Sequence, residues 1–373
     1  MKLILAHGEV VSHLFLLQRS EVRILVVQPY MNNLLDKIFF RSQNLNHINL
    51  GFKHIKKETE VSKIFEAIHS YSNNSEIRYV GGCVRKIINK ERYDDIDLAV
   101  NLNPKEVCEA LTKKNIKYYE SGIEHGTITA LINDIKFEIT SLRKDIDTDG
   151  RHAKVEFSDS WKDDASRRDF TFNSIYADIE GSLFDPFDGK KDLENGKINF
   201  IGNVETRIKE DYLRVLRYVR FFLSYSKHSH DPKVIKAIKK NLSGVSGISS
   251  ERLIDEFQKL LKSDGFLKLT KDKDCLEIIN LIFPQIKNIS LFNKMNTFAK
   301  KNFSDVDFIF LLSLMIIDGT DNVDYFIYKF NLSKKDQKRL IILNKFNLEK
   351  NTSQTFSEKN LNKFFILMVE RHY

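Results

Sequence analysis

Cysteines and long apolar runs are both scarce in this chain of 373 residues. Its three cysteines, Cys83, Cys108 and Cys275, show no metal-ligand spacing, which argues against a disulfide framework and against a zinc site. The longest strongly apolar run, Phe308–Ile317, is far shorter than the roughly 20 residues that cross a bilayer. We therefore expect a buried helix in that run and no association with a membrane.

The N-terminus lacks the features of a secretory signal. One lysine and four apolar residues are followed by the polar His7-Gly8-Glu9, a segment too short and too polar for that role. Residues 1–50 carry apolar clusters without a clear period. We interpret them as an N-terminal extension, either an added element or sequence upstream of the true start. From these features we expect a cytoplasmic protein.

What the chain does have is a basic balance, with a formal net charge of +8 and a sequence pI near 9.0. Such a charge suits a polyanionic partner, because basic side chains displace the counterions of a phosphate backbone. A lysine-rich protein without such a partner would have the same composition, so the charge alone does not decide between the two.

Periodicity divides the chain into an α+β first part and a helical remainder. The expected elements of the first part are a helix at 61–70, a strand at 77–80, a helix at 84–89, a strand at 96–100, a helix at 104–113 and a hairpin of strands at 127–132 and 135–142. Further strand-like segments lie at 176–184 and 198–201. From residue 205 onward we expect only helices separated by short polar loops.

Two carboxylates stand at the start of the expected strand 96–100. Asp95 and Asp97 flank Ile96, so both acids point to one face of the strand while Ile96 points into the core. Neighbouring carboxylates repel each other unless a cation lies between them, and hard oxygen ligands at this spacing suit Mg²⁺. A bare Asp-x-Asp is more often a pair of solvated acids, so its surroundings in the sequence decide its meaning.

Those surroundings include a double glycine and an arginine. Gly81-Gly82-Cys83-Val84-Arg85 begins fourteen residues before Asp95, between an expected strand and an expected helix. Glycines there let the backbone approach a phosphate, while helix N–H groups and Arg85 supply donors. Without the acidic strand behind it, the double glycine would be only a tight turn.

A third acid, Glu138, interrupts the apolar pattern of the expected strand 135–142. We predict that it joins Asp95 and Asp97 as a catalytic carboxylate. The alternative is an ordinary outward-facing strand residue.

With these features, the chain resembles the class II tRNA nucleotidyltransferase and bacterial poly(A) polymerase family over residues 60–262. Further motifs that carry the resemblance are His125-Gly126-Thr127 and the segments 147–153, 167–173, 185–189 and 210–214. The resemblance implies an α+β fold: a nucleotidyltransferase-type head with a small mixed sheet and flanking helices, followed by an all-helical neck, body and tail. The head, at 51–200, would hold the metals, the neck, at 201–262, would select nucleotides, and the body and tail, at 263–373, would bind RNA.

One position departs from the family. An acid usually follows Val-Arg directly, whereas Lys86 follows Arg85 in this chain. Two interpretations stay open: the lysine serves the triphosphate, or it weakens the site by replacing an acidic partner.

The resemblance also implies which residues bind the sugar. Arg168, Asp169 and Asn173 resemble the ribose-binding motif, in which hydrogen bonds between Asp169, Asn173 and the sugar hydroxyls favour ribonucleotides. The alternative is a structural salt bridge between Arg168 and Asp169.

An expected helix at 207–222 carries the signal for base selection. Its apolar residues at helical spacing are Ile208, Tyr212, Val215, Val219 and Phe222. The opposite face is then shared by Arg207, Asp211, Arg214 and Arg217 or Tyr218. Asp211 and Arg214, three positions apart, offer an acceptor beside a fork of donors. Such an edge suits cytosine and adenine, and it leaves buried groups unpaired against uracil and guanine. Apart from the resemblance, the pair would be a surface ion pair that adds little stability.

We therefore expect an enzyme that adds C, C and A to the 3′ acceptor end of tRNA from CTP and ATP, using Mg²⁺ in a two-metal mechanism that releases pyrophosphate. The expected catalytic residues are Asp95, Asp97 and Glu138, of which Asp95 and Asp97 hold the metal. The expected nucleotide-binding residues are Gly82, Arg85, Arg168, Asp169, Asn173, Asp211, Arg214 and Arg217. Three alternatives stay open: a poly(A) polymerase, a catalytically impaired RNA-binding paralogue, and a partial enzyme that adds only CC or only A.

Overall fold

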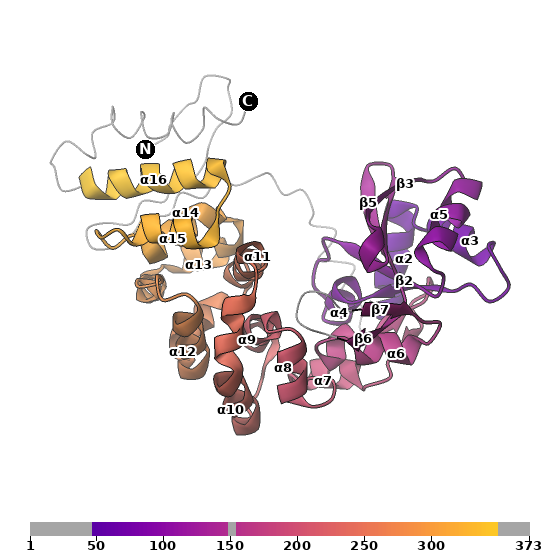
Figure 1. The fold of residues 1–373 in the computed structure, drawn as a ribbon, viewed down its shortest axis with the longest axis horizontal. Coiled ribbons are helices and arrows are strands. Elements are labelled where there is room, and N and C mark those ends of the chain that lie inside the picture. The colour runs from indigo at the N-terminus through magenta and orange to yellow at the C-terminus, as the bar shows by residue number, and fades with distance from the viewer. Residues whose placement is uncertain (1–46, 148–153, 350–373) are drawn as a thin grey trace, which may run out of the picture. The chain divides into compact units, whose positions relative to one another are not determined.

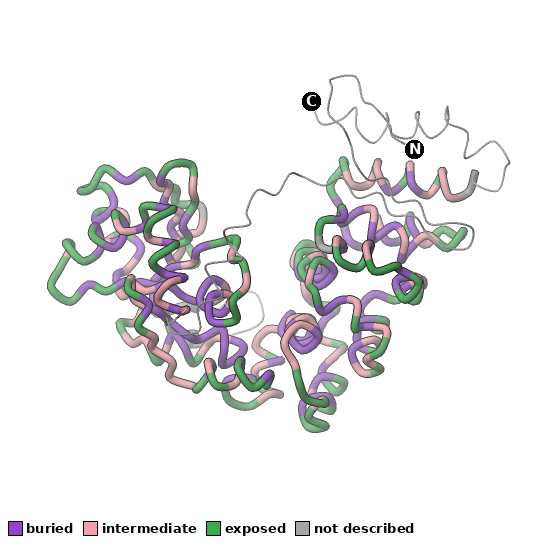
Figure 2. The backbone as a smooth tube through the Cα atoms, turned by 180° about the vertical axis from the view of Figure 1, so that it is seen from behind, coloured by how far each residue is buried: buried purple, intermediate pink, exposed green. Residues whose placement is uncertain are grey.

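A computed structural model describes residues 47–147 and 154–349 of the chain (Figure 1). These residues form two compact units. The first holds the described residues up to 214 together with 225–237, and the second holds 215–224 and 238–349. Buried residues, purple in Figure 2, occur throughout each unit, so each has a core of its own. The division into head, neck, and body with tail stays a prediction.

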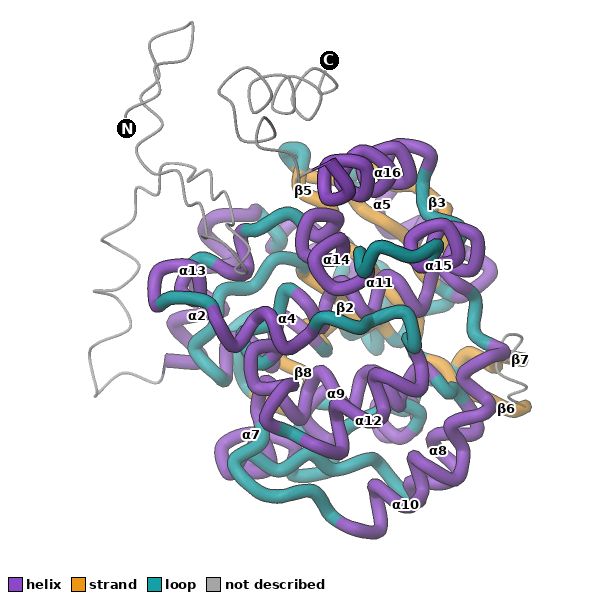
Figure 3. The backbone as a smooth tube through the Cα atoms, turned by 90° about the vertical axis from the view of Figure 1, so that its left-hand side faces the viewer, coloured by secondary structure: helices purple, strands orange, loops and turns teal. Residues whose placement is uncertain are grey.

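The first unit is built, within the described residues, on a mixed sheet of seven strands in the order β3-β4-β5-β2-β1-β8-β9. The strands are β1 (Ile77–Val80), β2 (Ile96–Val100), β3 (Lys117–Gly122), β4 (Thr127–Ile132), β5 (Ile135–Ser141), β8 (Tyr176–Ala177) and β9 (Leu183–Phe184). β2 and β5 run parallel, and the other neighbours run antiparallel. β6 (Arg143–Asp147) and β7 (Lys154–Phe157) form a separate antiparallel pair (strands are orange in Figure 3). The predicted α+β class with a mixed sheet is confirmed.

The same unit contains the helices α2 (His47–Thr59), α3 (Ser62–His69), α4 (Gly82–Ile88), α5 (Pro104–Lys113), α6 (Trp161–Ser166) and α7 (Gly189–Asn195). Of these, α3, α4 and α5 contact strands of the seven-stranded sheet, and α6 contacts β6. Three buried rings join α2, α3 and β1: the ring centroid of Tyr79 lies 4.8 Å from that of Phe52 and 5.1 Å from that of Phe65. Burying one such side chain stabilises a fold by about 1.5–3 kcal/mol. This cluster therefore anchors the helices around the strand that leads into the double glycine.

Several elements begin and end where the sequence predicts, namely β1, β2, β4 and α5. The structure adds α2, α6, α7, β3, β6 and β7, in which charged and polar residues interrupt the apolar pattern. The predicted strand 176–184 is instead two short strands, β8 and β9, because Asp178 accepts the amides of Glu180 and Ser182 and closes a turn between them. The predicted strand at 198–201 contributes only an isolated bridge between Phe170 and Phe200.

The prediction of one helix at 207–222 is wrong. The chain forms α8 (Val204–Glu210) and α9 (Leu213–Tyr225) with a break at Asp211. Asp211 has an extended backbone, with φ −153° and ψ 103°, and its Oδ1 accepts a hydrogen bond of 3.1 Å from the Leu213 amide. An aspartate side chain competes in this way with helical hydrogen bonding, so Asp211 separates the two helices.

The second unit contains helices and, among its described residues, no strand. Besides most of α9, its longer helices are α11 (Ser250–Leu261), α12 (Lys273–Ile282), α14 (Phe308–Ile316), α15 (Asn322–Phe330) and α16 (Lys334–Glu349). α14, which forms from the longest apolar run, is buried along most of its length, as predicted. The ring of Phe283 lies between Phe257 and Phe330, at centroid distances of 4.6 and 5.4 Å. No helix of the described chain has the length and apolarity that a membrane span requires.

Asn103 caps α5, and its loss should cost stability. Its side chain accepts hydrogen bonds from the amides of Lys105 and Glu106, and the Glu106 carboxylate accepts one from the Asn103 amide. We expect Asn103→Ala to lower the free energy of unfolding by about 0.5–2 kcal/mol, as measured by urea unfolding of the full chain. Lys105→Ala, at an exposed position of the same helix, should leave the midpoint unchanged. An equal loss in both variants would contradict the capping role.

Candidate active site

Asp97 and Glu138 are brought side by side by the parallel pairing of β2 with β5. Asp97 lies directly opposite Glu138 in the register, and opposite residues of paired strands project to the same face. Ile96 is buried, whereas Asp97 is half-buried and Asp95 is exposed at the start of the strand. The structure therefore gathers the three predicted carboxylates near the start of β2, with Glu138 of β5 exposed beside Asp97.

The carboxyl group of Asp97 feels the charges of its neighbours. Burial, the charge of Glu138 and the charge of Asp95 raise its pKa from 3.8 to about 6, against the lowering effect of the Arg168 and Arg85 guanidinium groups. Repulsion between the acids makes the ionised form of Asp97 costly, and a cation bound between them removes that cost. The cluster, Asp95 with Asp97 and Glu138, therefore has the electrostatics of a cation site.

The double glycine brings backbone close to this cluster. Gly81 has φ +71°, a conformation that favours glycine, and a Cβ atom at this position would lie 3.8 Å from both Asp97 Oδ2 and Arg168 Nη1. Gly82 begins α4, and a Cβ atom there would have no neighbour within 4 Å among the described residues. The backbone of the turn thus lies close to both Asp97 and Arg168, and the space over Gly82 is open.

Arg85 is buried on α4 and contacts another predicted nucleotide-binding residue. Its Nη1 donates a short hydrogen bond to Asn173 Oδ1, and Asn173 Nδ2 in turn donates to Asp169 Oδ1 at 2.9 Å. Asp169 Oδ1 also accepts the Phe170 amide at 2.8 Å. Three predicted residues are thereby linked in one chain of hydrogen bonds, Arg85–Asn173–Asp169.

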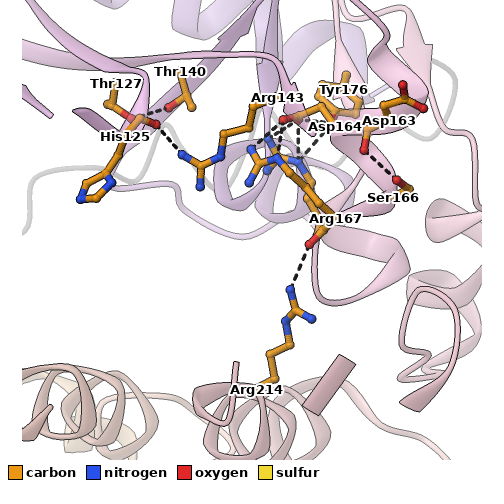
Figure 4. Close-up of polar contacts among 11 residues, drawn as sticks. His125, Thr127, Thr140, Arg143, Asp163, Asp164, Ser166, Arg167, Tyr176 and Arg214 are labelled. Atoms are coloured by element: carbon orange, nitrogen blue, oxygen red, sulfur yellow. Dashed lines mark hydrogen bonds and ion pairs between the residues drawn. The ribbon is translucent and has the colours of Figure 1, made fainter. Parts of the chain in front are cut away.

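Arg168 pairs with Asp164 and not with Asp169, which overturns the alternative of an Arg168–Asp169 salt bridge. Its Nη2 lies 3.0 Å from Asp164 Oδ2, and its Nε donates to the Tyr176 hydroxyl at 3.1 Å. Tyr176 donates to the same Asp164 oxygen at 2.6 Å, and Arg167 pairs with the other oxygen at 2.6 Å (Figure 4).

Asp164 is a site residue that the sequence reasoning missed. It is almost fully buried, at 1% exposure of its side chain, and although burial opposes ionisation, the guanidinium groups of Arg168 and Arg167 hold its pKa well below the usual range. Its spacing is the signal in the sequence that could have identified it, since the residues three and four positions after Asp164 are both arginines, just past the end of α6.

Arg214 is buried, and its guanidinium is already engaged. It donates to the Glu210 carboxylate at 2.7 Å, to the Arg207 carbonyl at 2.8 Å and, as Figure 4 shows, to the Arg167 carbonyl at 3.0 Å. Among the described residues, the side chain of Arg214 therefore pairs with Glu210 rather than with Asp211. The role of Asp211 and Arg214 as a template stays a prediction.

Arg217 belongs to the second unit. Its Nη1 lies 3.7 Å from the buried carboxylate of Glu256, and its guanidinium lies 5.5 Å from the ring of Phe221. Its part in nucleotide binding stays a prediction.

Lys86 has an acidic partner next to the cluster. Its Nζ lies 2.6 Å from Asp94 Oδ2, in an ion pair that is open to solvent on the Asp94 side. Because Asp94 precedes Asp95, the lysine holds the segment that enters the cluster.

Two family models match the chain. One, described as the poly A polymerase head domain, matches residues 77–199, and the other, described as the probable RNA and SrmB-binding site of polymerase A, matches residues 230–290. The human (Homo sapiens) CCA tRNA nucleotidyltransferase 1, mitochondrial, is 36% identical over 301 residues, which are 79% of this chain and 68% of the relative. The CCA-adding enzyme of Lactobacillus johnsonii is 34% identical over 247 residues, which are 65% of this chain and 59% of the relative.

Solved structures share the fold. The CCA-adding enzyme of Bacillus stearothermophilus in complex with CTP has a TM-score of 0.62 at 22% identity, covering 82% of this chain and 74% of that one. A tRNA nucleotidyltransferase complexed with a primer tRNA and an incoming ATP analog has a TM-score of 0.61 at 22% identity, covering 83% and 91%.

Asp164 should be required for the stability of the first unit. Asp164→Ala leaves two guanidinium groups without their buried partner, and we expect it to lower the free energy of unfolding by about 3–5 kcal/mol, measured by urea unfolding. Asp163→Ala, at the neighbouring acid of the same helix, is the matched control and should cost less than about 1 kcal/mol.

The contribution of Asp164 has a defined pH dependence. Because its pKa is lowered in the folded chain, the stabilisation is present above the unfolded value of about 4 and is lost as the pH falls below it. Wild-type stability should fall with pH in this range more steeply than that of Asp164→Ala. Parallel curves for the two proteins would show that the ion pairs contribute nothing.

Proposed function

Because the chain belongs to the CCA tRNA nucleotidyltransferase and poly(A) polymerase family, we propose that it adds C, C and A to the 3′ end of tRNA from CTP and ATP. The observation that carries the proposal is the cluster in which Asp97 faces Glu138 beside Asp95. Such a cluster suits transfer of a nucleotidyl group, and the names of the relatives supply the substrate and the product.

The cluster fits a divalent cation. Enzymes of this family normally use a divalent metal ion, and we assign Mg²⁺ to Asp95 and Asp97. The supporting observations are the strand register that sets Asp97 against Glu138 and the raised pKa of Asp97, which is caused first by burial and then by the charge of Glu138. When bound, the metal would lower the pKa of the attacking hydroxyl and stabilise the leaving pyrophosphate.

The reaction joins the tRNA to one nucleotide at a time. The 3′ hydroxyl oxygen of the terminal ribose forms a bond to the α-phosphorus of CTP or ATP. The bond from that phosphorus to the oxygen that bridges to the β-phosphate breaks, and pyrophosphate leaves with the electron pair. Glu138, exposed beside Asp97, is the residue to which we assign the proton of the attacking hydroxyl.

The hydrogen-bonded residues around the cluster suit the rest of the nucleotide. We assign Arg168, whose charge acts on Asp97, and the open backbone at Gly82 to the triphosphate. Asp169 and Asn173, linked to Arg85, are assigned to the ribose hydroxyls. Because these groups already bond one another, they are preorganised before the nucleotide arrives.

Base selection is assigned to the break between α8 and α9. The extended backbone at Asp211 and the buried Arg214 place an acceptor and a donor fork within three residues. Arg214 has five N–H donors, and its bonds to Glu210, Arg207 and Arg167 use three of them within the described chain, which leaves two for a base. Cytosine and adenine satisfy such an edge, and uracil and guanine leave it unpaired.

A poly(A) polymerase is the second candidate, since both matching family models carry that enzyme's name. An impaired RNA-binding paralogue, suggested by Lys86, is less well supported, because the charge of Lys86 is balanced by Asp94. The cytoplasmic location stays a prediction, and the human relative is named as mitochondrial.

An incorporation assay separates these candidates. On a tRNA that lacks its CCA end, we expect two C residues from CTP alone, none from ATP alone, and complete CCA with both, each addition releasing one pyrophosphate. Long runs of A from ATP alone would establish a poly(A) polymerase, and addition of CC or A only would establish a partial enzyme. Binding of tRNA without any pyrophosphate release would establish the impaired paralogue.

The carboxylate cluster should be needed for this activity. We expect Asp95→Ala to reduce incorporation at least about a thousandfold, a loss of about 4 kcal/mol in transition-state stabilisation, while tRNA binding is retained. Asp163→Ala is the control for removal of an acid elsewhere in the same unit. Full activity of Asp95→Ala would contradict the assignment.

The metal requirement should depend on pH through Asp97. Its pKa of about 6 means that below this pH the carboxyl group must lose a proton before it binds a cation. We expect the half-saturating Mg²⁺ concentration for incorporation to rise by about tenfold for each pH unit below 6. The affinity for tRNA, measured in parallel, should not follow the same curve. A half-saturating concentration that is constant from pH 5 to 8 would rule out this role.

A further inference from the structure

The segment between α4 and β2, residues 89–95, leads directly into the carboxylate cluster and is held at two points. One is the ion pair of Lys86 with Asp94. The other is Glu91, whose amide donates to the Lys86 carbonyl at 2.7 Å and whose Oε1 accepts a short hydrogen bond from Asn89 Nδ2. The second oxygen of the Glu91 carboxylate points to a residue distant in the sequence.

That residue is Tyr225, the last residue of α9. Its hydroxyl donates to Glu91 Oε2 at 3.0 Å and accepts from Arg85 Nε at 3.4 Å. The guanidinium of Arg85 also lies 5.7 Å from the Tyr225 ring, which meets Phe172 edge-on at a centroid distance of 6.1 Å. One hydroxyl thus joins the arginine after the double glycine to the segment that enters the cluster.

The direction of these hydrogen bonds is fixed by chemistry. Arg85 can only donate and the Glu91 carboxylate can only accept, so the hydroxyl between them must accept from one and donate to the other. Burial raises the pKa of Tyr225, and the hydroxyl therefore keeps its proton at neutral and mildly alkaline pH. The chain runs from Glu91 through Tyr225 and Arg85 to Asn173 and Asp169.

We infer that Tyr225 is a positioning residue for the nucleotide site, acting through Arg85 and through Glu91 on the segment that carries Asp95. This inference rests on the proposed function, in which Asn173 and Asp169, linked to Arg85, bind the ribose that CTP and ATP share. Loss of the hydroxyl should therefore weaken the binding of CTP and of ATP equally. If Tyr225 only stabilised the fold, its substitution would lower the unfolding midpoint without this common shift in the two affinities.

Tyr225→Phe tests the inference because it removes the hydroxyl and keeps the ring against Phe172 and Arg85. In the full chain, we expect the Kd for CTP and the Kd for ATP to rise by the same factor, about three- to tenfold, as for loss of one hydrogen bond. The affinity for tRNA and the unfolding midpoint should change little. Tyr79→Phe is the matched control: its buried hydroxyl has no partner within the described chain, so the same chemical change should leave both Kd values unchanged.

Glu91→Ala gives a second, independent test. It should raise the Kd for CTP and the Kd for ATP. The double variant with Tyr225→Phe should bind each nucleotide no more weakly than the weaker-binding single variant, because the two residues act through one contact. Wild-type affinities in Tyr225→Phe, a shift for one nucleotide only, or additive effects in the double variant would overturn the inference. Equilibrium binding separates the inference on Tyr225 from the proposed function. A wild-type protein that binds CTP and ATP but incorporates neither would refute the function and leave the Tyr225 test intact. A wild-type protein that binds neither nucleotide would refute the function and the inference.

Discussion

The parallel pairing of β2 with β5 is the constraint on which the candidate site depends. Its register sets Asp97 against Glu138, and a shift of one residue would turn Glu138 to the opposite face. That shift would also expose Phe137 and Ile139, which are fully buried. The apolar residues that stabilise the sheet therefore also fix the positions of the two acids. Burial of these apolar side chains offsets the free energy of repulsion between the carboxylates.

Positive charge around the cluster is held in place by a second layer of buried groups. Asp164 and Tyr176 orient Arg168, and Asn173 orients Arg85. A buried guanidinium is tolerated when its donors are satisfied, and its orientation is then restricted by the same bonds. This explains how a site with several charges of each sign keeps a defined geometry, and why residues with no direct part in the chemistry matter to it.

The sequence predicted the features that depend on local signals. β1, β2, β4 and α5 follow from alternation and from an Asn-Pro start, and Asp95 with Asp97 follows from the two-residue period of a strand. Contacts between distant segments could not be predicted in this way. Nothing in the local pattern indicates that Asp164 meets Tyr176, or that Glu91 meets Tyr225. The break at Asp211 was missed because the apolar period continues across it, while the side chain competes for the backbone.

We propose above all that Asp95 and Asp97, beside Glu138, bind a divalent cation, and Mn²⁺ binding followed by electron paramagnetic resonance tests this assignment without reliance on activity. We expect the wild-type chain to bind Mn²⁺ with an affinity that falls by about tenfold or more in Asp97→Asn and falls also in Glu138→Gln. The unfolding midpoint of each variant should be unchanged or raised. The expected rise follows from removal of a repelling charge. Equal Mn²⁺ affinity in the wild type and in both variants would contradict the assignment of a cation to this cluster.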